Sequence, residues 1–454
     1  MKQQYASQFD RMTLQPVPSL VRQLAGPAVV SMMISTIYNL VDTWFVAQLG
    51  TEAVAAVGIT FAVTEIIASI GYLFGMGSGT CVGMLLGARK NEEASRTGAT
   101  AFYSSVFLGL MFTLLGLVFL NPLMRFLGSS EAVLPYAAGY GRWILIAFPI
   151  MASSLVLSTI LRCEGKTRLS MLGIGIGGVM NMVLDPVFIF WLNLGIAGAA
   201  MATAVSQTAG LILLLYFFLS GKSEVSLHPK NITLTGKIFR SILVTGTPSL
   251  CRHGIRTFAT IVLNVSAGMF GGDVLIAALS IVTKVSSFIQ SVVKGIYQGA
   301  QAVFSYNKGA GLHGRVREAY RFTLAVTTLL ILVVAVAMLP LADTVMRLFN
   351  AKEETIRTVG AYALIVQTWS LLLMPFNFSG NSLLQSVGES WESSFLAVLP
   401  EGLFYMPTLF LLPRLLGQNG IIWACVVAQG LTAGVTLPFI LSYFRKTAML
   451  EKQG

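Results

Sequence analysis

Long apolar runs alternate with short polar breaks along almost the whole chain. Between Leu20 and Phe444 there are about twelve runs of roughly 20 apolar residues, and each could cross a hydrocarbon core of about 30 Å as a helix. Their centres lie near residues 33, 66, 107, 148, 180, 206, 256, 288, 330, 372, 402 and 431. The pattern predicts an all-α integral membrane protein with about twelve transmembrane helices.

A polar stretch near the middle of the chain divides it into two halves. It runs from Ser220 to Lys237 and contains two glycines and a proline, which interrupt helices. We therefore expect an N-lobe at residues 1–220, a linker at 221–240 and a C-lobe at 241–454.

The two halves share the positions of several glycines. Shifting the second half back by about 222 positions aligns Gly77 with Gly299 and Gly87 with Gly309. Six helices per half is an even number, so the halves are parallel repeats related by a pseudo-twofold axis along the membrane normal. The pattern predicts two six-helix bundles with a cleft between them, an arrangement that suits alternating access. A channel is the alternative, but the sequence has no filter-like motif.

The charged residues are few and unevenly placed. Only 11% of the residues are charged, against about 25% in soluble domains, and the net charge is +11. Lysines and arginines gather in the segments that share a side with the N-terminus, such as Arg89 and Lys90. The positive-inside rule then places both termini and the linker in the cytoplasm. Because topology explains the basic excess, we expect no nucleic-acid partner.

Two aspartates interrupt the apolar runs of the first half. Placing a carboxylate at membrane depth costs about 2.5 to 3.5 kcal/mol, so such residues usually serve ion or substrate passage. Asp42 lies four residues after Tyr38 and three after Asn39, so the three side chains share one helical face.

The second aspartate has a polar neighbour and a helix-breaking residue. Asn181 and Asp185 are four residues apart, and Pro186 cannot donate a backbone hydrogen bond. Thr203 and Gln207 could complete a polar cluster from the next run. Two facing carboxylates cannot both stay charged cheaply, so one should hold a proton or a cation. In the alternative reading, each aspartate caps a helix or pairs with a basic group for folding.

The second half has no matching pair of aspartates. Its runs instead carry basic and amide groups: Arg252, His253, Arg256, Lys284, Lys294, Asn377 and Asn381. The basic groups could pair with Glu401, accept an anionic part of a substrate, or extend toward the membrane surface. Glu65 could line the cavity opposite a cationic ligand or hydrogen-bond locally.

Several motifs in order resemble the multidrug and toxic compound extrusion (MATE) family over essentially the whole chain. They are YNLVDTWFVAQLG, LGARKNEEA, LRCEGKTRLSM, NMVLDPVFIF and LGIAGAAMATAVSQ. The resemblance implies a twelve-helix antiporter of the bacterial inner membrane that exports small organic cations and drugs in exchange for protons or sodium ions. We also expect contact with membrane lipids, function as a monomer and no cofactor besides the coupling ion.

The resemblance also implies roles for single residues. By motif position, Asp42, Asn181, Asp185 and Thr203 form the cation and proton site of the N-lobe, and sodium is the one metal expected there. Pro27 marks a bend in the first span, and Tyr38 lies beside the site. Some members carry a sodium site in the C-lobe on acidic residues. This chain has Arg252, Arg256, Asn377 and Asn381 on the corresponding spans, so we expect no such site here.

Three hypotheses follow from these patterns. The first is a multidrug antiporter coupled through the N-lobe. The second is a flippase for a lipid-linked or anionic substrate, which the basic residues of the seventh and eighth spans suggest. The third is a receptor or scaffold that transports nothing, in which the polar residues serve packing. An enzyme is not expected, because the sequence has no HExxH motif and no nucleophile elbow.

Overall fold

The chain forms two bundles of long helices in the computed structural model, which describes residues 7–233, 235–348 and 353–453. The first six residues of the expected N-lobe and the last residue of the expected C-lobe lie outside these ranges. The N-lobe contains α1 (Gln8–Leu14), α2 (Val17–Ala47), α3 (Thr51–Gly87), α4 (Asn91–Val118), α5 (Leu120–Phe126), α6 (Leu134–Cys163), α7 (Thr167–Pro186), a π-helical turn (Val187–Trp191) and α8 (Gly195–Leu219). The C-lobe contains α9 (Gly236–Gly309), α10 (His313–Leu348), α11 (Glu354–Ser386), α12 (Ser390–Val398), a second π-helical turn (Leu399–Leu403), α13 (Tyr405–Leu416) and α14 (Gln418–Gln453).

The number of membrane-crossing helices agrees with the sequence pattern. Eleven helices of the described residues are long and apolar enough to cross a membrane. The twelfth is the first part of α9, which carries Arg252 and Arg256 and is less apolar. The chain reverses at Gly272, whose backbone angles of φ 61° and ψ −160° are accessible essentially only to glycine. The expectation of about twelve helices is confirmed.

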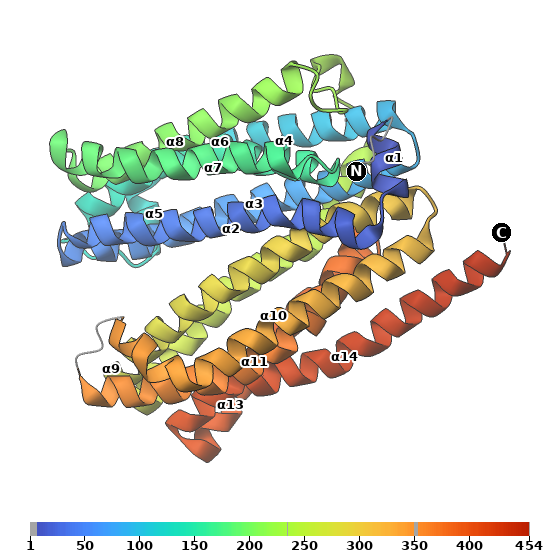
Figure 1. Ribbon diagram of the computed structural model, residues 1–454. Helices are drawn as coiled ribbons and strands as arrows, with labels where there is room; N and C mark the ends of the chain where they lie inside the picture. Colours follow the sequence, from blue (N-terminus) through green and yellow to red (C-terminus); the bar gives the residue numbers. More distant parts are fainter. Residues whose placement is uncertain (1–6, 234, 349–352, 454) are drawn as a thin grey trace.

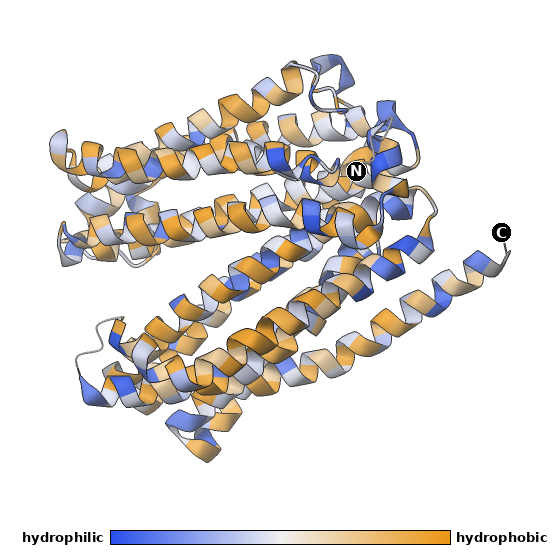
Figure 2. Ribbon diagram, in the orientation of Figure 1, coloured by the Kyte–Doolittle hydropathy of each residue, from blue (hydrophilic) through white to orange (hydrophobic). Residues whose placement is uncertain are grey.

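The two lobes converge on one side of the molecule and separate on the other (Figure 1). The side on which they converge carries α1 and both ends of the chain, and we call it the terminal side. We call the opposite side, where α5 and α13 lie, the open side. Figure 2 shows apolar residues along the outer faces of the helices and polar residues gathered toward their ends, as expected for helices in lipid.

Glycines bring the lobes together on the terminal side. A Cβ atom at Gly77 would overlap the carbonyl oxygen of Ile242, and one at Gly246 would overlap that of Leu73. The same close approach recurs further along α3 and α9, where Gly87 faces Tyr306 and Gly309 faces Met84. We call these contacts the glycine seam. Glycines repeated in the two halves therefore include residues that allow the two lobes to touch backbone to backbone.

The segment between the lobes is fixed to the N-lobe. Glu164, which follows α6, is fully buried and accepts hydrogen bonds from the Ser223 hydroxyl (2.5 Å) and the Glu224 amide (3.2 Å). Burial raises the pKa of the Glu164 carboxyl, and Lys166 at 3.3 Å opposes that shift. α9 begins at Gly236, so the last five residues of the expected linker are helical.

Candidate functional site

A cavity of about 780 Å³ lies between the two lobes. Its walls come from α2, α3, α6, α7 and α8 on one side and from α9, α11, α12, α13, α14 and the second π-helical turn on the other. Many of the residues predicted from the sequence line it: Tyr38, Asn39, Asp42, Glu65, Gln207, Arg252, Arg256, Asn377 and Asn381. Residues from distant parts of the chain are thus gathered around one space large enough for a drug-sized molecule.

Three more predicted residues form a cluster behind the N-lobe wall of the cavity. The Asn181 side-chain amide donates to Asp185 Oδ1 (3.0 Å) and to Thr203 Oγ1 (3.3 Å). The Thr203 hydroxyl donates in turn to the carbonyl of Ala199 (3.1 Å). Asp185 is 0% and Asn181 2% exposed. We call Asn181, Asp185 and Thr203 the N-lobe polar cluster.

Three buried oxygens beside the cavity lack a hydrogen-bond partner. They are Oδ1 of Asp42, Oδ1 of Asn181 and Oδ2 of Asp185. Asp42 also interacts electrostatically with Asp185. Neither aspartate is paired with a basic side chain in the part of the chain that the structure describes. An unpartnered buried polar atom costs about 1 to 3 kcal/mol, so each oxygen favours a proton or a cation that would satisfy it.

The donor set fits a sodium ion or a proton. Carboxylate, amide and hydroxyl oxygens are the ligands that hard cations prefer. Among the described residues no group of three or more His, Cys, Asp and Glu could hold a metal ion. A cation in the N-lobe polar cluster would therefore depend on Asn181 and Thr203 as well as on carboxylates.

Two prolines lie close to this region. Pro186 ends α7, and the chain continues as the π-helical turn Val187–Trp191. The hydrogen-bond pattern thus changes from α to π directly after Pro186. Bending of the helix at Pro186 stays a prediction. Pro27 lies inside α2, which continues as one helix from Val17 to Ala47. Bending of α2 at Pro27 stays a prediction.

The basic residues of the C-lobe wall have different surroundings. Arg252 donates to Asn381 and to Gln385 Oε1 (3.5 Å) and lies over the ring of Phe378. It forms no ion pair with Glu401 among the residues that the structure places. The Arg252 guanidinium therefore donates to side-chain amides and does not form the ion pair with Glu401 that the sequence allowed.

Another amide of α11, that of Asn377, also lines the cavity. Asn377 donates to the side chain (2.5 Å) and the carbonyl (3.1 Å) of Gln429 on α14. Lys284 differs from the other basic residues because it is exposed and does not line the cavity.

One contact across the cavity could not be predicted. His253 Nδ1 lies 3.6 Å from Glu65 Oε2, and the imidazole stacks on Tyr72 with ring centroids 4.6 Å apart. Glu65 and Tyr72 belong to α3 and His253 to α9. The sequence showed a histidine between two arginines, but its partner depends on how the two lobes meet.

A buried arginine closes the cavity on the terminal side. Arg162 of α6 is 4% exposed and donates to Gln298 of α9 (2.9 Å) and to Thr159 (3.3 Å). No motif in the sequence marks Arg162 as a residue of the site. Its position near the end of a predicted span gave no signal that it would reach the other lobe.

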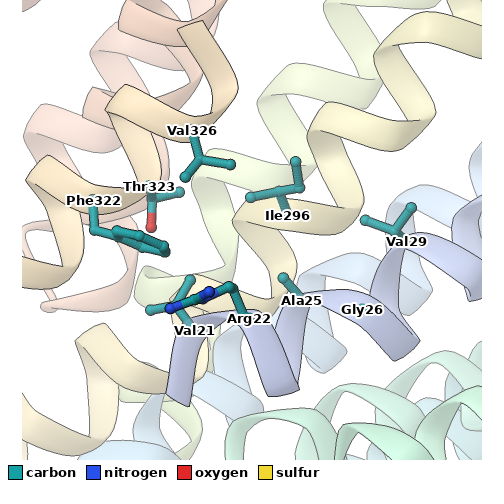
Figure 3. Close-up of a pocket in the computed structure, with 9 residues that line it drawn as sticks. All are labelled: Val21, Arg22, Ala25, Gly26, Val29, Ile296, Phe322, Thr323 and Val326. Atoms are coloured by element: carbon teal, nitrogen blue, oxygen red, sulfur yellow. The ribbon is translucent and has the colours of Figure 1, made fainter. Parts of the chain in front are cut away.

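A second pocket lies near the terminal side, between α2 and the helices α9 and α10. It has a volume of about 270 Å³, and Figure 3 shows its mostly apolar lining, with Arg22 and Thr323 as polar residues. The guanidinium of Arg22 lies 5.9 Å from the ring of Phe322. No acidic residue lines this pocket, so the cavity between the lobes is the candidate site for transport.

Known proteins share this architecture. The MatE family model matches residues 27–187 and again 248–408, one match in each lobe. The chain is 25% identical over 434 residues to the multidrug export protein MepA of Staphylococcus aureus (strain MSSA476), covering 95% of each protein. It is 26% identical over 429 residues to MepA of Staphylococcus haemolyticus (strain JCSC1435), covering 94% of this chain and 93% of the relative.

Solved structures agree over the whole length. An outward-facing multidrug resistance MATE family transporter of the MOP superfamily superimposes with a TM-score of 0.92 at 25% identity, covering 99% of this chain and 100% of the other. A MOP superfamily transporter from Pyrococcus furiosus Vc1 (DSM3638) gives the same values, and a reversed polarity of its binding pocket suggests a different function for it. These matches confirm the family resemblance and the fold. The chain therefore belongs to the MatE family, as a multi-pass membrane transporter of the multidrug efflux type.

Proposed function

We propose that the protein is a secondary antiporter that exports amphipathic organic cations in exchange for protons or sodium ions. The observation that carries the proposal is the N-lobe polar cluster, with unpartnered buried oxygens on Asn181 and Asp185 and a third on Asp42 beside it. A protein that only packed its helices would have no need of unsatisfied carboxylates there.

Coupling would follow from competition for negative charge. An organic cation in the cavity can be stabilised by Asp42 and Glu65, which both line it. A proton or sodium ion bound by Asp42 and Asp185 would neutralise the same wall and weaken the hold on the substrate. One charge moving inward through the membrane potential is worth about 2.3 kcal/mol per 100 mV. One-for-one exchange with a monovalent organic cation moves no net charge, so export of such a substrate would be driven by the concentration gradient of the coupling ion.

Alternating access would use the two lobes as rigid halves. The glycine seam and the contact of Arg162 with Gln298 close the terminal side. With both termini in the cytoplasm of a bacterial cell, as the positive-inside rule predicts, the closed side faces inward and the cavity faces out. We propose that a monomer in the inner membrane is the working unit, with no catalytic activity and no cofactor besides the coupling ion.

A second candidate function is a flippase for a lipid-linked or anionic substrate. It is favoured by the basic side chains that the C-lobe contributes to the cavity, Arg252, Arg256 and Lys294. The acidic N-lobe wall favours the antiporter, because it would repel an anion of either kind.

Dye efflux from proteoliposomes tests the proposal. The purified protein is reconstituted, and export of a fluorescent organic cation is followed under a proton gradient and under a sodium gradient imposed separately. We expect one gradient to accelerate efflux, and that gradient identifies the coupling ion. An efflux rate that is the same with and without each gradient would overturn the antiport mechanism.

A further inference from the structure

We infer that the C-lobe wall of the cavity contains an anion subsite formed by Arg256 and Lys294, which binds the acidic group of zwitterionic compounds. This inference rests on the proposed export function and assigns residues that distinguish among its substrates. It concerns residues to which the proposed coupling mechanism gives no role.

The charges around the cavity are divided between the lobes. The N-lobe wall carries the acids Asp42 and Glu65. The C-lobe wall carries the bases Arg252, His253, Arg256 and Lys294 and the single acid Glu401. A ligand with separated positive and negative groups would match both walls, whereas a simple cation would match only one.

Two of these bases are already occupied by the protein. Arg252 is held by the amides of Asn381 and Gln385. His253 is in contact with Glu65 and Tyr72 of the opposite lobe. Both side chains therefore already have partners within the protein.

Arg256 and Lys294 differ, because their side chains have no hydrogen bond or ion pair within the described residues. They come from the two parts of α9 on either side of the reversal at Gly272 and line the same cavity. The positive charge of Arg256 acts on Lys294, and both side chains are partly buried. Two neighbouring positive charges in a partly desolvated site repel each other, and a bound anion would relieve that repulsion.

The acidic side chains near Arg256 and Lys294 are too few to neutralise the positive charge of the C-lobe wall. Glu401 interacts with Arg252 and Lys294 electrostatically but forms no ion pair within 4 Å in the described chain. Its Oε2 is buried and has no hydrogen-bond partner. Glu401 thus acts on two of the basic groups, and Glu65 of the opposite wall also acts on Lys294. The C-lobe wall still has more basic than acidic side chains.

The ligand chemistry follows from the side chains. A guanidinium binds a carboxylate through two parallel hydrogen bonds, and a lysine adds a point charge. A cavity of about 780 Å³ admits a drug-sized molecule. Such a molecule could place its cationic group against the N-lobe acids and its carboxylate against Arg256 and Lys294, touching both lobes at once.

A pair of dyes that differ by one ester group tests this subsite. The full-length protein is titrated with a rhodamine methyl ester, which is a cation, and with the corresponding free acid, which is a zwitterion. Binding is measured by fluorescence polarisation. We expect the wild type to bind the acid at least about fivefold more tightly than the ester, because charge-assisted hydrogen bonds add to binding.

Substitutions then locate the acid-binding group. We expect Arg256→Gln and Lys294→Gln each to weaken binding of the free acid about tenfold. The difference in affinity between the acid and the ester should therefore become smaller. Arg256→Lys should keep most of the preference, because it keeps the charge. Lys284→Gln is the matched control on the same helix, because Lys284 is exposed and does not line the cavity, and its ratio should equal that of the wild type.

The outcomes separate this inference from the proposed function. Equal binding of acid and ester by the wild type, or an unchanged ratio in both glutamine variants, would overturn the subsite. Tighter binding of fluorescein, an anion on the same ring system, than of the zwitterion would overturn the zwitterionic class. If one variant elutes as an aggregate on size exclusion, the other variant and Arg256→Lys decide the result. Failure of the wild type to export the ester under any gradient would instead overturn the antiporter.

Discussion

At the scale of single residues, Asn181 connects the N-lobe polar cluster. Its amide group donates to both Asp185 and Thr203, which leaves its own carbonyl oxygen free. The four-residue spacing between Asn181 and Asp185 made this contact predictable, because such pairs share a helical face. The contact with Thr203 depends on how α7 packs against α8, so the sequence could offer Thr203 only as a candidate.

Removing the Thr203 hydroxyl should weaken binding of the coupling ion. Thr203→Val takes away the oxygen that accepts from Asn181, and a hydrogen bond of this kind is worth about 0.5 to 1.5 kcal/mol. We expect the ion concentration at half-maximal efflux to rise up to about tenfold. Thr203→Ser restores the hydroxyl and serves as the control. A valine variant with the ion dependence of the wild type would remove Thr203 from the site.

At the scale of helices, glycines decide how closely α3 and α9 approach. The repeat of glycines was visible in the sequence and indicated a duplicated fold. That some of them form an interface between the lobes was not visible, because glycine repeats also occur where helices of one bundle pack together. The reversal at Gly272 lies between the spans predicted near residues 256 and 288, but hydropathy did not indicate which residue would make it.

The glycine seam should not tolerate a methyl group. Gly246→Ala places a Cβ against the carbonyl oxygen of Leu73 and must push α3 and α9 apart, at a cost of about 1 to 3 kcal/mol. Gly254→Ala lies on the same helix with no atom within 4 Å of its new Cβ. We expect Gly246→Ala to have a lower midpoint of thermal unfolding in detergent than the wild type. The midpoint of Gly254→Ala should equal that of the wild type. Equal midpoints would show that the seam is not a tight contact.

At the scale of the whole molecule, the number of spans and the duplication followed from hydropathy and from the offset of about 222 positions. The contacts between the two lobes could not be predicted from either of these patterns. Glu65 and His253 are almost 190 positions apart in the sequence, and their contact exists only in one relative placement of the lobes. Local sequence patterns cannot encode such contacts, because they depend on how the two lobes are placed relative to each other.

The orientation in the membrane can be checked directly. The test uses a reporter that is active only in the cytoplasm. Fused to the C-terminus, it should be active, because the basic loops lie on the same side as both chain ends and are predicted to be cytoplasmic. An identical fusion after the short loop between α2 and α3 provides the opposite signal. A C-terminal reporter that works only outside the cell would reverse the assignment of the closed side and with it the direction of the cavity.

The role of Asp185 in ion coupling is the central claim, and gradient-driven dye accumulation in proteoliposomes tests it most directly. The ratio of dye across the membrane is compared with and without the coupling gradient for the wild type, Asp185→Asn and Asp343→Asn. Asp343 is the control because it is an exposed aspartate of α10 that pairs with Arg347 (2.8 Å) and Arg357 (3.0 Å) and lies outside the cavity lining. We expect the gradient to raise the ratio in the wild type and in Asp343→Asn and to leave it unchanged in Asp185→Asn. A gradient response that survives in Asp185→Asn would contradict coupling through the N-lobe.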